Sequence, residues 1–185
     1  MKDKNKKEEK SFMNSIIEWI KVFLLAIIIA AAITMFIKPT LVRGDSMLPT
    51  LHENDYLIIN RIGYKIGEPE KDDIIVFKSD ITQGDGTEKD LVKRIIGVAG
   101  DEILITEGQV YVNGELLQVP YLENGTYTEG EINLVVPQGK LFVLGDNRIV
   151  SLDSRFEEVG LVDVDDVLGK VFLRLYPFNN ISFID

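Results

Sequence analysis

The sequence predicts a mostly β protein with one N-terminal transmembrane helix, followed by a single β-rich domain. Residues 16–37 form one long apolar run, whereas the apolar runs beyond residue 40 are short and rich in Val, Ile, Leu and Tyr. Turn-forming pairs such as Asn113-Gly114 separate these short runs. No segment of the second part keeps the 3.6-residue periodicity of an amphipathic helix for long.

Residues 1–15 are predicted to form a cytoplasmic tail, and residues 16–37 to form the membrane span. The tail is rich in lysine, with Lys2, Lys4, Lys6, Lys7 and Lys10. As a helix, residues 16–37 would extend about 33 Å, enough to cross the hydrocarbon core. Glu18 and Lys21 can pair near the headgroups, with Trp19 as an interfacial anchor. The lysine-rich end stays in the cytoplasm, which places residues 38–185 outside the plasma membrane.

Two other interpretations of this segment exist. A buried core helix is rarely apolar on every face over such a length. A cleaved signal peptide shares the lysines and the apolar run, and Ala30–Ala32 resembles a small-residue cleavage site. The apolar run continues from Ile33 to Ile37, however, where a cleavage region should become polar. An uncleaved anchor is therefore expected.

The second part, residues 38–185, is predicted to form the β domain, with residues near 102–138 as a hairpin-rich insertion. A tight hairpin is expected at Asn113-Gly114 and a short helical turn over 153–159, ending at Gly160. Four aromatic residues near the C-terminus, namely Phe172, Tyr176, Phe178 and Phe183, are assigned to core packing in preference to contact with the bilayer. The strands are expected at 56–59, 74–77, 91–98, 103–105, 110–112, 134–136, 141–144 and 167–176.

Composition and charge exclude several classes of function. The chain has no cysteine and one histidine, His52, so disulfides, thiolate metal sites and multi-histidine metal sites within one chain are excluded. The net charge is −10, and it is negative in the β domain, which argues against nucleic acid as a partner. No metal or organic cofactor is implied, and His52 is expected on a loop.

Ser46 and Lys93 are the first two candidates for chemistry. Ser46 lies in a predicted tight turn, where most serines only bond to the backbone. Lys93 interrupts an apolar strand, and a buried amine can lose its proton and act as a base. A sheet-edge lysine that deters aggregation is the alternative. Arg94 points to the opposite face of that strand and suits a salt bridge.

The third candidate segment, residues 145–155, follows an apolar strand and is dense in hydroxyl, carboxylate and guanidinium groups. Together the segments resemble the bacterial type I signal peptidases, and their order and spacing are similar to that family's. The single anchor, short domain and acidic character resemble the Gram-positive members. The matching motifs are S-M-L-P-T at 46–50, D-Y-L-I-I-N-R at 55–61, K-R-I-I-G-V-A-G-D at 93–101 and G-D-N-R-I-V-S-L-D-S-R at 145–155.

The resemblance implies a signal-peptidase-type catalytic domain that cleaves signal peptides from exported preproteins after Ala-X-Ala-type sites. It implies Ser46 as nucleophile and Lys93 as general base. It also implies a supporting group, in which Ser151 orients the lysine amine, Asp153 pairs with Arg155, and Asp146 pairs with Arg94. The substrate groove would be lined by Met47, Val42 and Leu41. The partners would be preproteins and the lipid bilayer.

One position departs from the pattern. Some members carry a serine two places before the nucleophile, whose hydroxyl helps to hold the oxyanion, and this chain has Gly44. Gram-positive members commonly share this glycine, so the second oxyanion donor is unassigned. Two rival functions are a cytoplasmic self-cleaving Ser/Lys repressor-type peptidase, which the anchor opposes, and a catalytically silent anchored binding domain, which the presence of Ser46 and Lys93 opposes.

Overall fold

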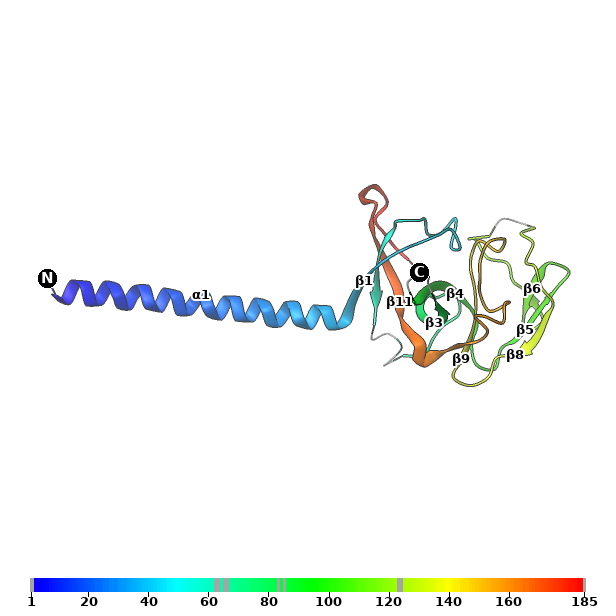
Figure 1. Cartoon of the computed structure of the whole chain (residues 1–185), viewed down its shortest axis with the longest axis horizontal. Helices are drawn as coiled ribbons and strands as arrows, with labels where there is room; N and C mark the ends of the chain where they lie inside the picture. The colour runs from blue at the N-terminus through cyan, green and yellow to red at the C-terminus, as the bar shows by residue number, and fades with distance from the viewer. Residues whose placement is uncertain are drawn as a thin grey trace. The chain divides into compact units, whose positions relative to one another are not determined.

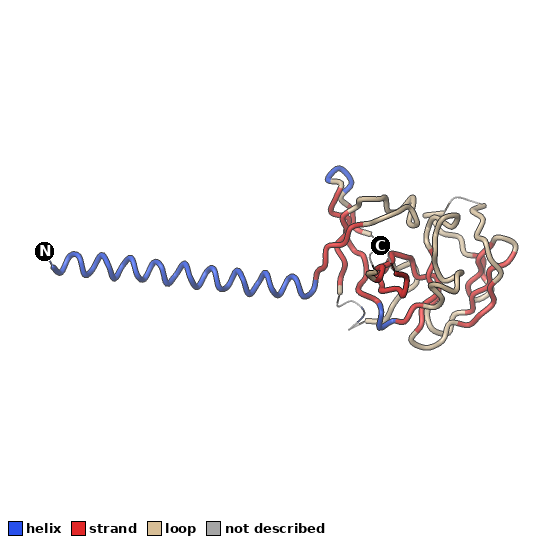
Figure 2. Tube along the Cα trace, viewed as in Figure 1, coloured by secondary structure: helices blue, strands red, loops and turns tan. Residues whose placement is uncertain are grey.

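The chain forms two compact units, Met1–Ile37 and Lys38–Asp185. The computed structural model describes residues 2–61, 64, 67–82, 84, 86–122 and 125–184. Helix α1 (Lys2–Phe36) makes up the first unit, whereas the described part of the second contains strands, turns and two short 3-10 helices (Figures 1 and 2). These are η1 (Val164–Asp166) and η2 (Phe178–Asn180). The predicted fold class, mostly β with one N-terminal helix, is confirmed.

Helix α1 contains one stretch, Met13–Ala31, that is long and apolar enough to cross a membrane. Lys21 Nζ donates a hydrogen bond to Glu18 Oε1 over 3.0 Å, so the two charges near the start of this stretch neutralise each other. The helix continues past Ala31 to Phe36 without a break.

The second unit contains two antiparallel sheets. The larger sheet has the order β1-β2-β11-β3-β4-β9-β10, and β12 pairs with β11. The smaller sheet has the order β7-β6-β5-β8 (Figure 1). The larger sheet is formed by β1 (Ile37–Leu41), β2 (Tyr56–Asn60), β3 (Ile74–Thr82), β4 (Glu88–Gly97), β9 (Lys140–Leu144), β10 (Val162–Asp163), β11 (Val167–Tyr176) and β12 (Ser182–Phe183). The smaller is formed by β5 (Glu102–Thr106), β6 (Gln109–Val112), β7 (Glu115–Leu116) and β8 (Ile132–Val135).

The first part of strand β3, residues 74–77, is buried on both faces, which explains its uninterrupted apolar sequence. Ile74 and Val76 pack into one core cluster, while Ile75 and Phe77 pack into a second cluster on the other side of the sheet. Strand β9 connects the second cluster to a third in the same way, because its alternate side chains reach the smaller sheet. The three clusters hold β4 rigidly between β3 and β9.

Two predictions about the C-terminal part have different outcomes. The short helical turn expected over 153–159 is present as successive hydrogen-bonded turns, and the backbone N–H of Gly160 closes the last one by donating to Phe156 O. The assignment of the C-terminal aromatic residues to the core is wrong for three of the four, because Tyr176 is 45% exposed and Phe178 and Phe183 are each 75% exposed. Phe172 is half-buried. Hydrophobicity alone does not tell which face of a strand end is covered.

Candidate active site

Ser46 lies in a turn that is fixed by buried residues on both sides. Val42 exchanges backbone hydrogen bonds with the segment before β2, since its N–H donates to Asp55 O and its carbonyl accepts from Asn54 N–H. Met47 is 1% exposed and packs in the first core cluster. Ser46 between them is half-buried. The chain therefore has a tight turn here, with its serine held at the edge of the core.

Lys93 projects from β4 towards this turn. Its Nζ lies 2.8 Å from Ser46 Oγ and 2.9 Å from the Val92 carbonyl oxygen, to which it donates. Lys93 is 2% exposed, and β4 is an interior strand. The alternative of a sheet-edge lysine is therefore wrong.

The position of Lys93 changes its acidity. Burial lowers the pKa of the Lys93 amine from 10.5 to about 8, although the negative charge of Asp153 acts in the opposite direction. Among the described residues, no carboxylate forms an ion pair with Lys93. A lysine without a counter-ion in such surroundings can lose its proton near neutral pH.

Arg94, the next residue on β4, is fully partnered. Its Nε and Nη2 donate to the two carboxylate oxygens of Asp146 over 2.9 and 2.8 Å, and its Nη1 donates to the Asp72 carbonyl. The Tyr121 ring covers the guanidinium at 3.8 Å. Burial alone lowers the pKa of Arg94, but the hydrogen bonds and charge of Asp146 outweigh burial and raise it. The salt bridge predicted for Arg94 is confirmed.

Asp153 fixes the loop formed by residues 145–155. Its carboxylate is completely buried and accepts hydrogen bonds from the Gly145 backbone N–H and from Arg155 Nε and Nη2. Arg155 Nη2 also donates to the carbonyl oxygens of Arg148 and Ser151. The expected Asp153–Arg155 pair is present, and it links both ends of the loop.

Ser151 lies close to the turn that carries Ser46. It is 3% exposed, and a Cβ at position 145 would come within 2.2 Å of its Oγ and 2.5 Å of the Ser46 carbonyl oxygen, so only glycine fits there. Among the described residues, Ser151 Oγ has no hydrogen-bond partner. The described hydrogen bonds of Lys93 go to Ser46 and Val92. The role of orienting the lysine amine therefore stays a prediction.

An open groove of about 630 Å³ runs past the two residues. Leu41, Val42 and Met47, the three residues predicted to line it, do so together with Ser46 and Lys93. Its far rim includes Val150, which is 60% exposed, and Leu152. The groove combines aliphatic and charged lining residues with a hydroxyl and an amine in contact.

Comparison with known proteins agrees with this arrangement. The family described as "Signal peptidase, peptidase S26" matches residues 16–176. The chain belongs to this family. It is therefore a serine peptidase, a hydrolase of peptide bonds, and the resemblance drawn from the four motifs is confirmed.

Individual relatives cover nearly the whole chain. Signal peptidase I of Bacillus licheniformis is 38% identical, over 96% of this chain and 99% of its own length. Signal peptidase IB of Staphylococcus aureus is 37% identical, over 91% of this chain and 93% of its own. A crystal structure of a signal peptidase I from Enterococcus faecalis is 29% identical and covers 56% of this chain and 96% of that one, with a TM-score of 0.45.

Two residues of this peptidase that support the site received no role from the sequence. Thr50 Oγ1 donates to Asp146 Oδ2 over 2.5 Å, and the Asn147 backbone N–H donates to the Ser46 carbonyl over 3.0 Å. Asn147 Nδ2 also donates to the Asp45 carbonyl. Both residues lie inside the matched motifs, so their places in S-M-L-P-T and G-D-N-R were the available signal.

His52 plays no part in the described site. It is exposed, and its backbone N–H donates to Asp55 Oδ2. In the described ranges, no group of three or more His, Cys, Asp or Glu side chains could hold a metal ion. The groups in contact at the groove are the Ser46 hydroxyl and the Lys93 amine, a pair that acyl transfer by a serine nucleophile can use.

Proposed function

We propose that this enzyme is a membrane-anchored endopeptidase that removes N-terminal signal peptides from exported preproteins after small residues of the Ala-X-Ala type, with Ser46 as nucleophile and Lys93 as general base. The observation that supports this most is the 2.8 Å separation of Lys93 Nζ and Ser46 Oγ in a groove that Leu41, Val42 and Met47 help to line. A serine hydroxyl needs a base within hydrogen-bond reach to become a nucleophile.

The acidity of Lys93 supports its role as that base. With a pKa of about 8, about one amine in ten is neutral at pH 7, compared with roughly one in three thousand at the ordinary pKa. In the neutral amine, the lone pair of Nζ accepts the Ser46 hydroxyl proton, and one N–H donates to the Val92 carbonyl. That second contact aims the lone pair at Ser46.

The reaction then has two halves. Ser46 Oγ attacks the scissile carbonyl carbon while Lys93 takes its proton, and the resulting oxyanion collapses as Lys93 gives that proton to the leaving amine. The signal peptide remains as an ester on Ser46. A water molecule, deprotonated by Lys93, attacks this ester, and the protonated lysine returns the proton to Ser46 Oγ as the signal peptide leaves. The enzyme ends in its starting state.

The backbone N–H of Ser46 is the first oxyanion donor. Among the described residues it donates to no other group, which leaves it available for the substrate carbonyl. Gly44 supplies no hydroxyl, and its φ of +82° turns the chain just ahead of the serine. Ser151 orients the Lys93 amine, the Asp153–Arg155 pair holds the loop formed by residues 145–155, and the Arg94–Asp146 pair anchors β4 to that loop.

The two strands beside the groove support binding of an extended peptide. β1 is an edge strand of the larger sheet, and residues Glu88–Val92 of β4 pair with β3 on one side while β9 pairs only from Arg94 onwards. Unpaired backbone groups on these two segments suit a substrate strand. The aliphatic side chains of Leu41, Val42 and Met47 suit small apolar residues of the substrate.

The N-terminal unit supports a location at the outer surface of the plasma membrane. The apolar stretch Met13–Ala31 can cross the bilayer once, and the lysine-rich residues before it are held on the cytoplasmic side by the positive-inside rule. Ser46 follows the helix end at Phe36 by ten residues. An extended chain of that length reaches at most about 36 Å. The nucleophile therefore works close to the membrane surface, where signal peptides emerge.

The test is cleavage of a purified preprotein with an Ala-X-Ala site by the full chain in detergent, compared between wild type, Ser46→Ala and Lys93→Ala. We expect wild type alone to produce a mature protein whose N-terminus follows the final Ala. Equal cleavage by all three would contradict the Ser46–Lys93 mechanism. Absence of cleavage by wild type would contradict the substrate assignment.

A further inference from the structure

Arg148 is a buried cation that the proposed mechanism does not use. It is 3% exposed, and its Nε donates to the Gly145 carbonyl over 3.1 Å while its Nη1 donates to Thr128 Oγ1 over 2.8 Å. Its Nη2 is fully buried and has no hydrogen-bond partner among the described residues. Buried donors are normally paired, so an unpaired guanidinium nitrogen calls for an explanation.

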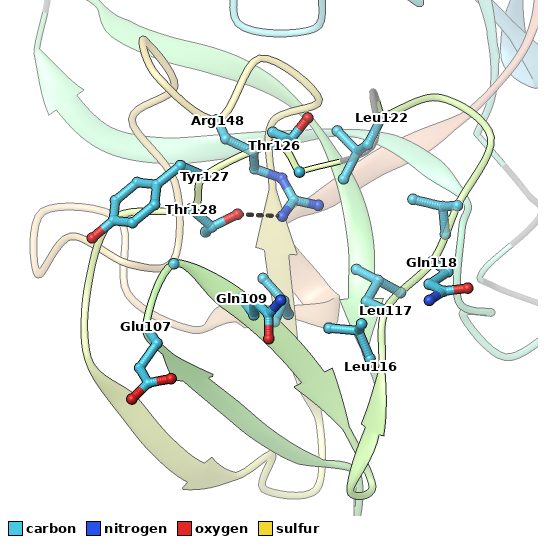
Figure 3. Close-up of a pocket in the computed structure, with 14 residues that line it drawn as sticks. Glu107, Gln109, Leu116, Leu117, Gln118, Leu122, Thr126, Tyr127, Thr128 and Arg148 are labelled. Atoms are coloured by element: carbon cyan, nitrogen blue, oxygen red, sulfur yellow. Dashed lines mark hydrogen bonds between the residues drawn. The ribbon is translucent and has the colours of Figure 1, made fainter.

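The guanidinium lines a pocket of about 250 Å³ at the smaller sheet, outside the groove that holds Ser46. Figure 3 shows it pointing into the space between Thr126, Thr128, Gln109 and Leu117. Five aliphatic side chains line the same pocket, namely Val110, Leu116, Leu117, Val119 and Leu122. The pocket therefore has a cationic end and an aliphatic wall.

Among the described residues, no carboxylate pairs with Arg148 in this pocket. Asp146 and Asp153, the nearest carboxylates in sequence, form bidentate pairs with Arg94 and Arg155. Among the described lining residues, Glu107 is the one acidic side chain, and it is exposed. Burial lowers the pKa of the Arg148 guanidinium, as expected for a cation without a contacting counter-ion.

We propose that this pocket binds a carboxylate carried on a short aliphatic group, with the carboxylate on Arg148 and the aliphatic part against Leu116 and Leu117. Planar guanidinium groups match carboxylates in charge and geometry, and a desolvated pair is stronger than an exposed one. The aliphatic wall selects against inorganic anions, which have no apolar part to bury. Two sources share this chemistry, the C-terminus of a peptide that ends in an aliphatic residue and a free aliphatic acid.

The experiment uses the full chain with the Ser46→Ala substitution in detergent, so that no peptide probe is cleaved. The protein carries ¹⁵Nε-labelled arginine, and the Arg148 signal is assigned by its loss in Arg148→Lys. The probes are 4-methylpentanoate and acetyl-Ala-Leu with a free C-terminus, each compared with its amide. We expect both acids to shift the Arg148 signal saturably and the amides to bind at least tenfold more weakly.

A matched pair of variants locates the site without disturbing Arg148. Leu116→Asp adds a negative charge to the pocket wall, and Leu175→Asp makes the same change on β11, at a residue of nearly equal exposure (39% and 41%). We expect Leu116→Asp to weaken binding of the acids at least tenfold and Leu175→Asp to leave it unchanged.

Three results would overturn the proposal: no saturable shift with either acid, equal binding of acids and amides, or equal effects of the two aspartate variants. Tighter binding of the peptide than of 4-methylpentanoate identifies a peptide C-terminus as the source, and equal binding identifies a free acid. Because the host lacks Ser46, none of these results depends on the Ser46–Lys93 mechanism.

Discussion

Lys93 and Arg94 are neighbours on β4, and the surroundings on the two faces of this strand shift the pKa of a buried cation in opposite directions. Both residues are almost fully buried, at 2% and 3% exposed. On one face Lys93 meets a hydroxyl and a carbonyl oxygen, and its pKa falls to about 8. On the other face Arg94 meets the Asp146 carboxylate, a backbone carbonyl and an aromatic ring, and its pKa rises.

The difference teaches that burial alone does not determine what a charged residue does. Removing a cation from water disfavours its charged form, and only a contacting counter-ion reverses that effect. Lys93 has no contacting counter-ion among the described residues, so it is suited to give up its proton. Arg94 has one, so it is suited to fix β4 against the loop formed by residues 145–155. The same strand thus carries a proposed base, Lys93, and a residue, Arg94, whose salt bridge holds the strand in position.

The largest expected effect comes from replacing Lys93, the proposed base. Lys93→Met removes the base and should lower kcat/KM by at least about 10³-fold, within the range that general bases contribute. Because it also removes an uncompensated buried charge, the free energy of unfolding should not fall. Cleavage assays and urea unfolding followed by pulse proteolysis measure the two quantities.

Lys78→Met is the control for this variant, because Lys78 is exposed on the adjacent strand β3. Its activity should stay within about twofold of wild type. A Lys93→Met enzyme that retained wild-type activity would contradict the proposed base.

Arg94→Met should do the reverse and act mainly on stability. It leaves the buried Asp146 carboxylate without its cation, which typically costs about 3–5 kcal/mol. The double variant Arg94→Met/Asp146→Leu should recover much of that loss, since it leaves no unpaired charge. Arg61→Met, at an exposed position, is the control. An unfolding free energy of Arg94→Met equal to that of the Arg61→Met control would show that the Arg94 salt bridge does not stabilise the fold.

The pH dependence of kcat/KM should distinguish Lys93 from Arg94 further. Since the proposed base must be neutral, kcat/KM should fall about tenfold per unit as pH decreases below about 8. Arg94 should contribute no step to this profile, because the hydrogen bonds and charge of Asp146 raise its pKa. A rate that stays level down to pH 6 would contradict a lysine base.

The same shift predicts a change of stability with pH. Between pH 8 and 10.5 the unfolded Lys93 binds more protons than the folded one, so the free energy of unfolding should rise through this window. The full rise attributable to Lys93 is about 3 kcal/mol. Lys93→Met should remove it, which a comparison of the two unfolding curves at pH 8 and 10.5 would reveal.

The smallest expected effect concerns Gly44, which lies two residues before Ser46. A Cβ at this position meets no atom within 4 Å, but the φ of +82° is unfavourable for other residues. Gly44→Ala and Gly44→Ser should therefore each lower the free energy of unfolding by about 1 kcal/mol. Any difference in kcat between them isolates the hydroxyl as an oxyanion donor, and equal kcat values would mean that other groups fill that role.

The different surroundings of Lys93 and Arg94 were partly predictable from the sequence. Alternation along a strand places them on different faces, and the matched motifs supply partners for both. The contacts of Thr50 with Asp146 and of Asn147 with Ser46 were not predictable, because they join segments about 100 residues apart and depend on side-chain geometry.

The core assignment of the C-terminal aromatic residues failed for a related reason. The sequence shows that Phe178 and Phe183 are apolar, but it does not show that β12 is two residues long and covers little of β11. In contrast, β11 was predicted with its observed bounds, 167–176, because its apolar run is long and ends at Pro177. Strand identity follows from local pattern, whereas burial at a sheet end depends on what packs there.

The acidity of the Lys93 amine is the most direct test of the central claim. A titration of full-length enzyme labelled with [¹³Cε]-lysine, with the Lys93 signal assigned by its absence in Lys93→Met, reports the protonation of Nζ. The account predicts a pKa of about 8, well below the other lysines. A Lys93 signal that titrates with the exposed lysines, near 10.5, would contradict it.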